Sequence, residues 1–158
     1  MDLQKLLKED EYYTPKSTWE AIANFIPKDK VIWEAFYSPH SKSPQYLKEL
    51  GFNVISKNRD FFEKNYGDII VSNPPFSKKK QVLQRLHDLQ KPFLLILPVT
   101  CISSKYFQDV FKNEPIQLII PSKRIEFEYL GKKKARCGFS CIYVCWKINL
   151  DKDINFLG

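Results

Sequence analysis

Four consecutive residues in the middle of the chain, Asn73, Pro74, Pro75 and Phe76, are the segment best suited to chemistry. Two adjacent prolines continue neither a strand ladder nor a helix, so the backbone there is rigid. Asn73 offers a side-chain carbonyl, and Pro74 offers a backbone carbonyl with no N–H of its own. Such a pair of acceptors can hold both hydrogens of an exocyclic amine, while Phe76 can lie against an aromatic ring. The segment predicts a site for the amino group of a nucleobase; the simpler alternative is a rigid turn that serves packing alone.

Two clusters of basic residues suggest what carries that amino group. The net charge is +7, which favours an anionic partner, most simply nucleic acid. One cluster directly follows the diproline segment, where positive charge at a helix start is unfavourable unless an anion is near. We expect both clusters to contact a nucleic-acid backbone, the alternative being an ordinary solvated surface. Their members are Lys78, Lys79 and Lys80, then Lys132, Lys133, Lys134 and Arg136.

A metal site is not expected, although Cys137, Cys141 and Cys145 recur every four residues. Their segment is rich in aromatic and branched residues and reads as a strand. Neighbouring sulfurs would then lie about 13 Å apart, too far to share one zinc ion. We interpret these cysteines as small buried apolar groups. Of the two histidines, His40 belongs to a polar loop and His87 is expected on the exposed surface of a helix.

The elements that position these residues follow from apolar periodicity. Strands are predicted at residues 31–36, 52–55, 68–72, 93–97, 117–120, 125–129 and 139–146. Helices are predicted at residues 2–9, 17–26, 45–50 and 77–90, and from Ser103 or Ser104 through Phe111. Alternating strands and helices indicate an α/β fold with a mostly parallel, doubly wound sheet and helices on both faces. The closing strands, joined near Gly131, predict a C-terminal antiparallel hairpin at one edge.

Length and composition set further bounds. The chain has 158 residues, of which 44% are hydrophobic, so we expect residues 1–158 to form a single domain with one core. Only five glycines are present, and no glycine-rich phosphate loop can be written anywhere. No apolar run reaches the roughly 18 residues of a membrane span, and the first residues lack a signal-peptide pattern. We therefore expect an intracellular protein, cytoplasmic or nuclear, that does not associate with membranes.

Several short motifs, taken in order, resemble those of one enzyme family. Asn73–Phe76 after a buried strand resembles motif IV of class I S-adenosylmethionine-dependent amino-methyltransferases, chiefly those acting on N6 of adenine. Tyr13-Thr14-Pro15 before a helix resembles the family's N-terminal cofactor motif. Residues 32–36 resemble its first strand, and Asp60-Phe61-Phe62 resembles the motif that holds the cofactor's adenine. The tail, with Pro121, Arg124-Ile125-Glu126-Phe127 and Trp146, is similar to that of small phage and large-DNA-virus members.

The resemblance implies a Rossmann-like class I methyltransferase fold and a function. Asn73 and the Pro74 carbonyl would orient an amine toward the sulfonium methyl of S-adenosylmethionine, with Pro75 and Phe76 completing the amine site and no metal. Glu34 would face the methionine part of the cofactor. The substrate would be nucleic acid, DNA rather than RNA, with flipping of a base paired in a duplex. The cofactor pocket would be lined by Tyr13, Thr14, Pro15, Glu34, Phe36, Asp60, Phe61 and Asn73.

The chain departs from the family pattern in two places. The loop after the first strand, residues 37–44, contains no glycine, and Ser56-Lys57-Asn58 stands where an acid usually meets the cofactor's ribose. These departures support an alternative, a catalytically inactive methyltransferase-fold subunit that binds nucleic acid or a partner protein. Other enzymatic substrates that present an NH₂ group are adenine in RNA, N4 of cytosine and a glutamine side chain. The chain is short for a target-recognition domain, so a second subunit could read the target, in a virus-infected cell if the viral resemblance holds.

Overall fold

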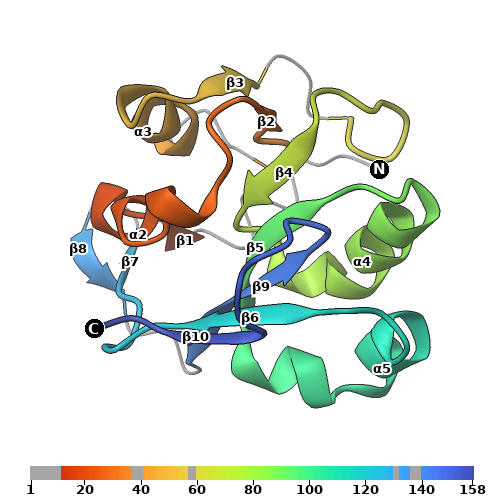
Figure 1. Cartoon of the computed structure of the whole chain (residues 1–158). Helices are drawn as coiled ribbons and strands as arrows, with labels where there is room; N and C mark the ends of the chain where they lie inside the picture. The colour runs from red at the N-terminus through yellow and green to blue at the C-terminus, as the bar shows by residue number, and fades with distance from the viewer. Residues whose placement is uncertain (1–11, 37–40, 57–59, 130–131, 136–139) are drawn as a thin grey trace.

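The computed structural model describes residues 12–36, 41–56, 60–129, 132–135 and 140–158 (Figure 1). The strands are β1 (Tyr12–Tyr13), β2 (Val31–Trp33), β3 (Asn53–Ile55), β4 (Ile69–Ser72), β5 (Phe93–Pro98), β6 (Gln117–Ile120), β7 (Phe127–Tyr129), β8 (Lys132–Ala135), β9 (Cys141–Trp146) and β10 (Ile154–Phe156). The α-helices are α2 (Lys16–Glu20), α3 (Ser43–Glu49), α4 (Lys79–Asp88) and α5 (Lys105–Phe111). Short 3₁₀ helices are η1 (Ala23–Phe25), η2 (Phe76–Lys78) and η3 (Val99–Ser103). The predicted helix at residues 2–9 lies outside the described residues.

The main sheet has seven strands in the order β10-β6-β9-β5-β4-β2-β3. Strands β3, β2, β4 and β5 pair in parallel, and β9 runs antiparallel to both of its neighbours, β5 and β6. β10 pairs in parallel with β6 and forms one edge. The mixed α/β architecture and the mostly parallel sheet therefore confirm the prediction from strand–helix alternation.

The predicted C-terminal hairpin is wrong in its arrangement. Residues 125–129 do not pair beside 139–146 at a sheet edge; β7 instead joins β1 and β8 in a separate three-stranded sheet. All six residues of β9 are buried, since the strand has neighbours on both sides as well as on both faces. A strand with this much apolar surface is stabilised in the middle of the sheet rather than at its margin.

The core lies on both faces of the main sheet. On one face, α4 and α5 contribute Val82, Leu86 and Phe111 to a buried cluster with strand residues. On the other, α2, the following turn and α3 contribute Trp19, Ile22 and Leu47. Helices thus cover both faces, as a doubly wound sheet requires (Figure 1). None of the helices within the described ranges is long and apolar enough to cross a membrane.

Two helices differ from their predicted bounds. The helix expected at residues 17–26 divides into α2 and η1, because Ile22 has φ −117° and ψ 4°, outside the helical region. The helix expected from residue 77 begins as η2, and α4 starts at Lys79. The short η2 sits directly behind the diproline segment, whose fixed φ angles do not continue a helix.

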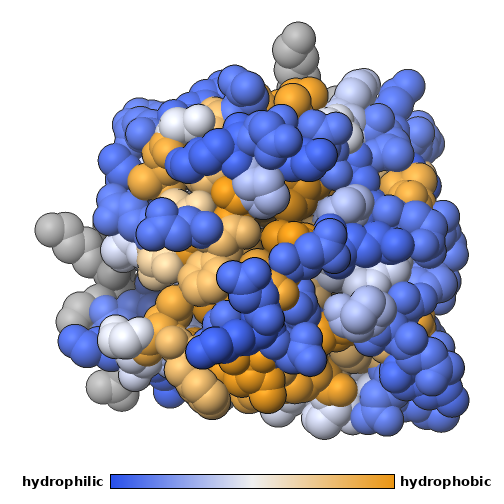
Figure 2. All heavy atoms as spheres, in the orientation of Figure 1, coloured by the Kyte–Doolittle hydropathy of each residue, from blue (hydrophilic) through white to orange (hydrophobic). Residues whose placement is uncertain are grey.

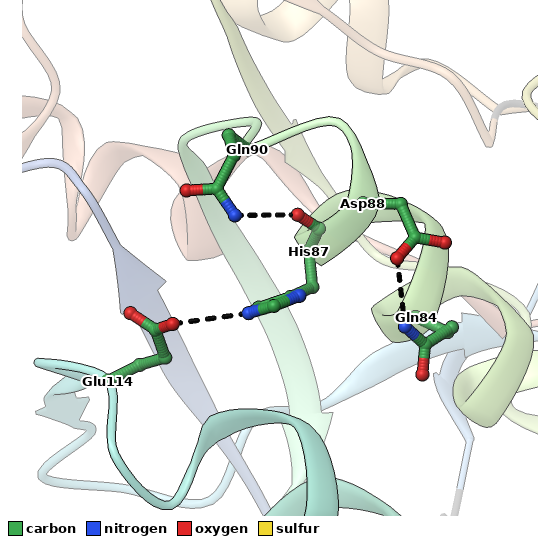
Figure 3. A network of polar contacts seen from close by, with 5 residues as sticks. All are labelled: Gln84, His87, Asp88, Gln90 and Glu114. Carbon is green, nitrogen blue, oxygen red and sulfur yellow. Dashed lines mark hydrogen bonds and ion pairs between the residues drawn. The ribbon is translucent and has the colours of Figure 1, made fainter.

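His87 was expected to be exposed, and that expectation is wrong. Its ring stacks on Trp146 with centroids 5.5 Å apart and meets Phe111 edge-on at 5.7 Å. Figure 3 shows its Nε2 directed at Glu114 Oε1, 3.1 Å away, while the His87 carbonyl accepts from Gln90. The His87 ring therefore covers one end of the core, where α4, α5 and β9 meet.

The cysteines on β9 are buried, as the sequence predicts. Cys141 and Cys145 are 4% and 0% exposed, and burial raises the pKa of the Cys145 thiol to about 12. A thiol held neutral in this way is a poor metal ligand and nucleophile. Cys137 lies outside the described residues.

Candidate functional site

The strand order places two loops together at one end of the sheet. From β2 the chain moves to β3 on one side and then returns to β4 on the other. In an open parallel sheet, ligands bind at the carboxyl ends of the strands where the order reverses in this way. The residues that follow β2 include Glu34 and Phe36, and those that follow β4 begin with Asn73. All three were predicted as site residues, and the strand order places them at the same end of the sheet.

Glu34 and Ser72 connect the two strand ends. Glu34 is 2% exposed, Ser72 Oγ donates to its Oε1, and the Phe36 amide donates to the same oxygen at 3.1 Å. Burial raises the pKa of Glu34 to about 7, and the two donors oppose that rise without cancelling it. Burial therefore favours the protonated form of this carboxyl more than water does. A cation brought beside it would favour the carboxylate.

Asn73 is held by the N-terminal segment. Its Nδ2 donates to the Thr14 hydroxyl oxygen at 3.2 Å, and Thr14 is 4% exposed. Tyr13 precedes Thr14 on β1 and pairs with Glu128 on β7, which fixes the segment against the small sheet. Asn73 Oδ1 is buried, and no described residue donates to it. A buried carbonyl without a donor is costly, and a ligand N–H placed there would remove that cost.

The diproline corner is rigid and buried on the side that faces the core. Pro74 and Pro75 are both buried, and Pro75 is extended at φ −62° and ψ 122°. The Pro75 carbonyl accepts from the Lys78 amide at 3.0 Å, which starts η2. No donor in the described ranges bonds the Pro74 carbonyl. This corner therefore has a carbonyl acceptor to offer next to Asn73, as the sequence predicts.

Phe76 is half-buried at the end of the corner. Its ring meets Phe127 at the start of β7 at 6.5 Å between centroids and 77° between planes. Lys79 Nζ lies 5.7 Å from the Phe76 centroid. The small sheet and α4 thus hold the ring from two sides, which sets the position that a base stacking on it could occupy.

The predicted adenine-binding residues are packed more tightly than the sequence suggests. Phe61 is 0% exposed, and its ring lies 4.7 Å from Phe36 and 5.7 Å from Trp33, centroid to centroid. Arg85 anchors the Phe61 carbonyl with a 2.6 Å hydrogen bond from Nε. Asp60 is half-buried and begins the turn, since its carbonyl accepts from two amides further along. The Phe36 and Phe61 rings therefore pack against each other behind the strand ends.

The two basic clusters lie on separate elements, one at η2 and the start of α4 and the other on β8. Lys78 and Lys79 are half-buried, whereas Lys80 is exposed and lines a separate pocket of about 570 Å³ between α4 and α5. Lys132, Lys133 and Lys134 belong to β8 at the edge of the small sheet; their side chains and all of Arg136 lie outside the described residues.

Sequence reasoning missed two features near this end of the molecule. Ser72 was read as the last residue of a strand, although it donates to Glu34; a serine ending a buried apolar run is the only signal in the sequence. A hollow of about 770 Å³ lies between α2 and the loop after β6. Its rim carries Lys123 and Arg124, which are exposed, and the hydroxyl residues Ser17 and Ser122. Glu126, also exposed, lines the same hollow, which lies beside Pro15, one residue from Thr14.

Taken together, this end of the sheet offers a buried carboxyl, a rigid pair of carbonyl acceptors and an aromatic ring. The acceptors suit an NH₂ group, and the carboxyl suits a positively charged ligand. Residues 37–40 and 57–59, which contain His40 and part of each departure from the family pattern, lie outside the described residues; residues 41–44 and Ser56 lie within them. The chain matches no protein-family profile and no curated protein.

Proposed function

We propose that the chain transfers a methyl group from S-adenosylmethionine to an exocyclic amine, with N6 of adenine in DNA as the leading substrate. The observation that carries this proposal is the buried Asn73 Oδ1, to which no described residue donates a hydrogen bond. The carbonyl of the next residue, Pro74, offers a second acceptor. Two acceptors on a rigid corner at a topological switch point match what an amino group needs. A Rossmann-like class I methyltransferase fold is part of the same proposal.

Glu34 and the residues that hold it fit the cationic part of this cofactor. Bound S-adenosylmethionine supplies an electrophilic methyl group on a positively charged sulfonium, together with the ammonium of its methionine part. Glu34 is a buried carboxyl without a described cationic partner, and its raised pKa reflects that environment. Ser72 and the Phe36 amide hold one carboxyl oxygen in a fixed orientation. Glu34 would therefore bind a cationic part of the cofactor, and Thr14 would keep Asn73 in place beside it.

The chain contributes to transfer mainly by alignment. Asn73 Oδ1 and the Pro74 carbonyl would accept the two amine hydrogens, which directs the nitrogen lone pair away from the protein and toward the methyl donor. The same two oxygens would stabilise the positive charge that develops on the nitrogen as the new bond forms. Phe76 would stack on the ring that carries the amine, an interaction worth roughly 1–3 kcal/mol for a base.

Positive charge near the crevice supports nucleic acid as the substrate. Lys79 lies beside Phe76, and Lys123 and Arg124 line the hollow next to Pro15. An acceptor pair recognises the amine and not the ring behind it, so adenine in RNA, cytosine N4 and a glutamine amide present the same group. Adenine in DNA remains the leading proposal because the motif order resembles enzymes that act on it.

The experiment that tests the proposal is incubation with methyl-labelled cofactor and separate DNA, RNA and protein substrates. We expect label in an adenine-containing DNA with the natural chain and none above background with Asn73→Ala. Asn113→Ala is the matched control, since Asn113 is exposed in the turn after α5. Label in DNA that survives Asn73→Ala would contradict the role given to Asn73, and absence of label in every substrate would contradict the proposed activity.

A binding subunit without activity is the second candidate, and one observation favours it. Phe36 and Phe61 are 4% and 0% exposed and lie against each other, so neither ring is free to meet an adenine. Thermal unfolding with added S-adenosylmethionine separates the two candidates. At 100 times the dissociation constant a ligand stabilises the native state by about 2.7 kcal/mol, or roughly 5–10 °C for a chain of this size. No shift at millimolar cofactor would favour the binding subunit.

A further inference from the structure

Among the described residues, strand β10 leaves an unpaired edge on the main sheet. It pairs with β6 on one side only, and Figure 1 shows it along the outer margin near the C-terminal label. Edge strands in natural proteins are usually protected by shortness, charge, proline or a bulge. β10 is short, with three residues, but it reads Ile-Asn-Phe and contains no charge, proline or bulge. Its free side is therefore a template for another strand.

The backbone groups on that free side belong to two residues. The Asp153 carbonyl accepts from the Leu118 amide, and the Leu157 amide donates to the Ile120 carbonyl. Backbone groups alternate in direction along a strand, so the groups of residues 153, 155 and 157 face β6. Those of Ile154 and Phe156 face outward, and no hydrogen bond reaches them from the described residues. The edge thus offers two donors and two acceptors.

The side chains of the same two residues form an exposed apolar strip. Ile154 is 53% exposed and Phe156 is 77% exposed. They stand in register with Leu118 and Ile120, which are half-buried, so all four lie on one face of the sheet. Figure 2 shows apolar side chains gathered at the lower margin of the molecule, where Figure 1 draws the helical segment between β5 and β6. The strip continues the core beyond the cover that α5 provides.

We propose that β10 pairs antiparallel with β10 of a second copy of this chain, about a two-fold axis at Asn155. In this register Ile154 stands opposite the second copy's Phe156, and the reverse pair forms by symmetry. Residues opposite each other whose groups both face the partner exchange both N–H···O=C bonds. The two pairs therefore use all four outward groups of each edge. In such an interface, residue 154 of each copy contacts residue 156 of the other. An interface of this self-complementary kind closes a dimer.

The side chains and charges agree with a second copy as the occupant. Antiparallel pairing puts Ile154 and Phe156 of both copies on one face of a continuous sheet, where they cover one another. The same pairing brings Asp153, which precedes the strand, next to the second copy's Leu157. Leu157 lines the same hollow as Lys123, Arg124 and Glu126, so Asp153 would approach a rim that carries two basic side chains and one acidic side chain of the other copy. A homodimer is thus favoured over an unrelated strand.

The test is the oligomeric state of the whole chain, measured by sedimentation velocity across a range of concentrations. We expect a reversible dimer in the natural chain and at least a tenfold rise in the dissociation constant for Phe156→Lys. Val99→Lys is the matched control, because Val99 is also an exposed hydrophobic residue, 41% exposed, but belongs to η3. A chain that stays monomeric at every concentration, or a dimer that Phe156→Lys leaves unchanged, would overturn the proposal.

A cross-link checks the register independently. At the two-fold axis the two Asn155 positions face each other as a non-hydrogen-bonded pair, with Cα atoms about 4.5 Å apart. That separation lies within the range of a disulfide. Asn155→Cys should therefore form a covalent dimer under mild oxidation, whereas Lys30→Cys, at an exposed position before β2, should not. Equal cross-linking of the two variants, or none at position 155, would contradict the register. Neither measurement depends on the proposed methyl transfer.

Discussion

Replacing the buried carboxyl, Glu34→Gln, should make the stability of the protein less sensitive to pH. Glutamine keeps the size of the side chain and an oxygen that accepts from Ser72 and the Phe36 amide. Burial raises the pKa of Glu34 from 4.5 to about 7, so the folded state holds its proton more tightly than the unfolded chain does. The group therefore costs nothing below about pH 4.5 and progressively destabilises the native state as pH rises toward 7. Raising the pKa of Glu34 by about 2.5 corresponds to a loss of about 3 kcal/mol in the free energy of unfolding above pH 7.

The assay is urea unfolding at several pH values, followed by the fluorescence of the buried Trp19, Trp33 and Trp146. We expect the variant to gain stability over the natural chain as pH rises, by little at pH 5 and by about 3 kcal/mol at pH 8. A difference that is the same at pH 5 and pH 8, or that has the opposite slope, would refute the reasoning. The variant should also lose affinity for S-adenosylmethionine, because the carboxylate that meets a cation is gone.

Four further substitutions test individual contacts. Thr14→Val removes the acceptor for the Asn73 amide, so we expect a loss of about 1–3 kcal/mol in urea unfolding and at least a tenfold slower methyl transfer. An unchanged rate of methyl transfer would contradict the positioning role of Thr14. Lys91→Met leaves three oxygens in residues 65–67 without the donor that now lies 2.6–2.8 Å away, which should cost about 3 kcal/mol in the same assay; a loss below about 1 kcal/mol would show that water replaces the amine. Gly67→Ala should destabilise by about 1–3 kcal/mol, since φ is +66° and the new Cβ would lie 2.9 Å from the Val31 carbonyl oxygen. Gly51→Ala, with φ +97° but no contact closer than 3.7 Å, should cost less, and the reverse order would contradict the steric argument.

The buried strands could be read from the sequence because their signal is local. β6 has the predicted bounds, residues 117–120, and β4 and β5 each differ by one residue at one end. A short run of apolar residues between turn residues is sufficient to predict such strands. β10 was missed because it has three residues, two of them exposed, and therefore no run of buried positions. The interior place of β9 was missed because strand order depends on contacts between distant segments.

The candidate site shows the same division between local and distant information. The rigidity of Pro74-Pro75 and the acceptor of Asn73 follow from residue chemistry alone. The contact between Thr14 and Asn73 spans 59 residues, and only the resemblance of both segments to one family pointed to it. The packing of Phe61 against Phe36 could not be foreseen, because a pair of aromatic residues beside an acid can face a ligand or the core. His87 was misplaced for a related reason, since the residues that cover it come from α5 and β9.

The most direct measurement is mass spectrometry of the nucleosides released from DNA after reaction with S-adenosylmethionine. If Asn73 and the Pro74 carbonyl hold an adenine amine beside the methyl donor, digestion of the product should yield the nucleoside N6-methyldeoxyadenosine. This nucleoside should be missing from the Asn73→Ala reaction and present in the Asn113→Ala reaction. If the natural chain leaves DNA unmodified under conditions where the cofactor binds, that result would contradict the assignment of adenine methylation to these residues.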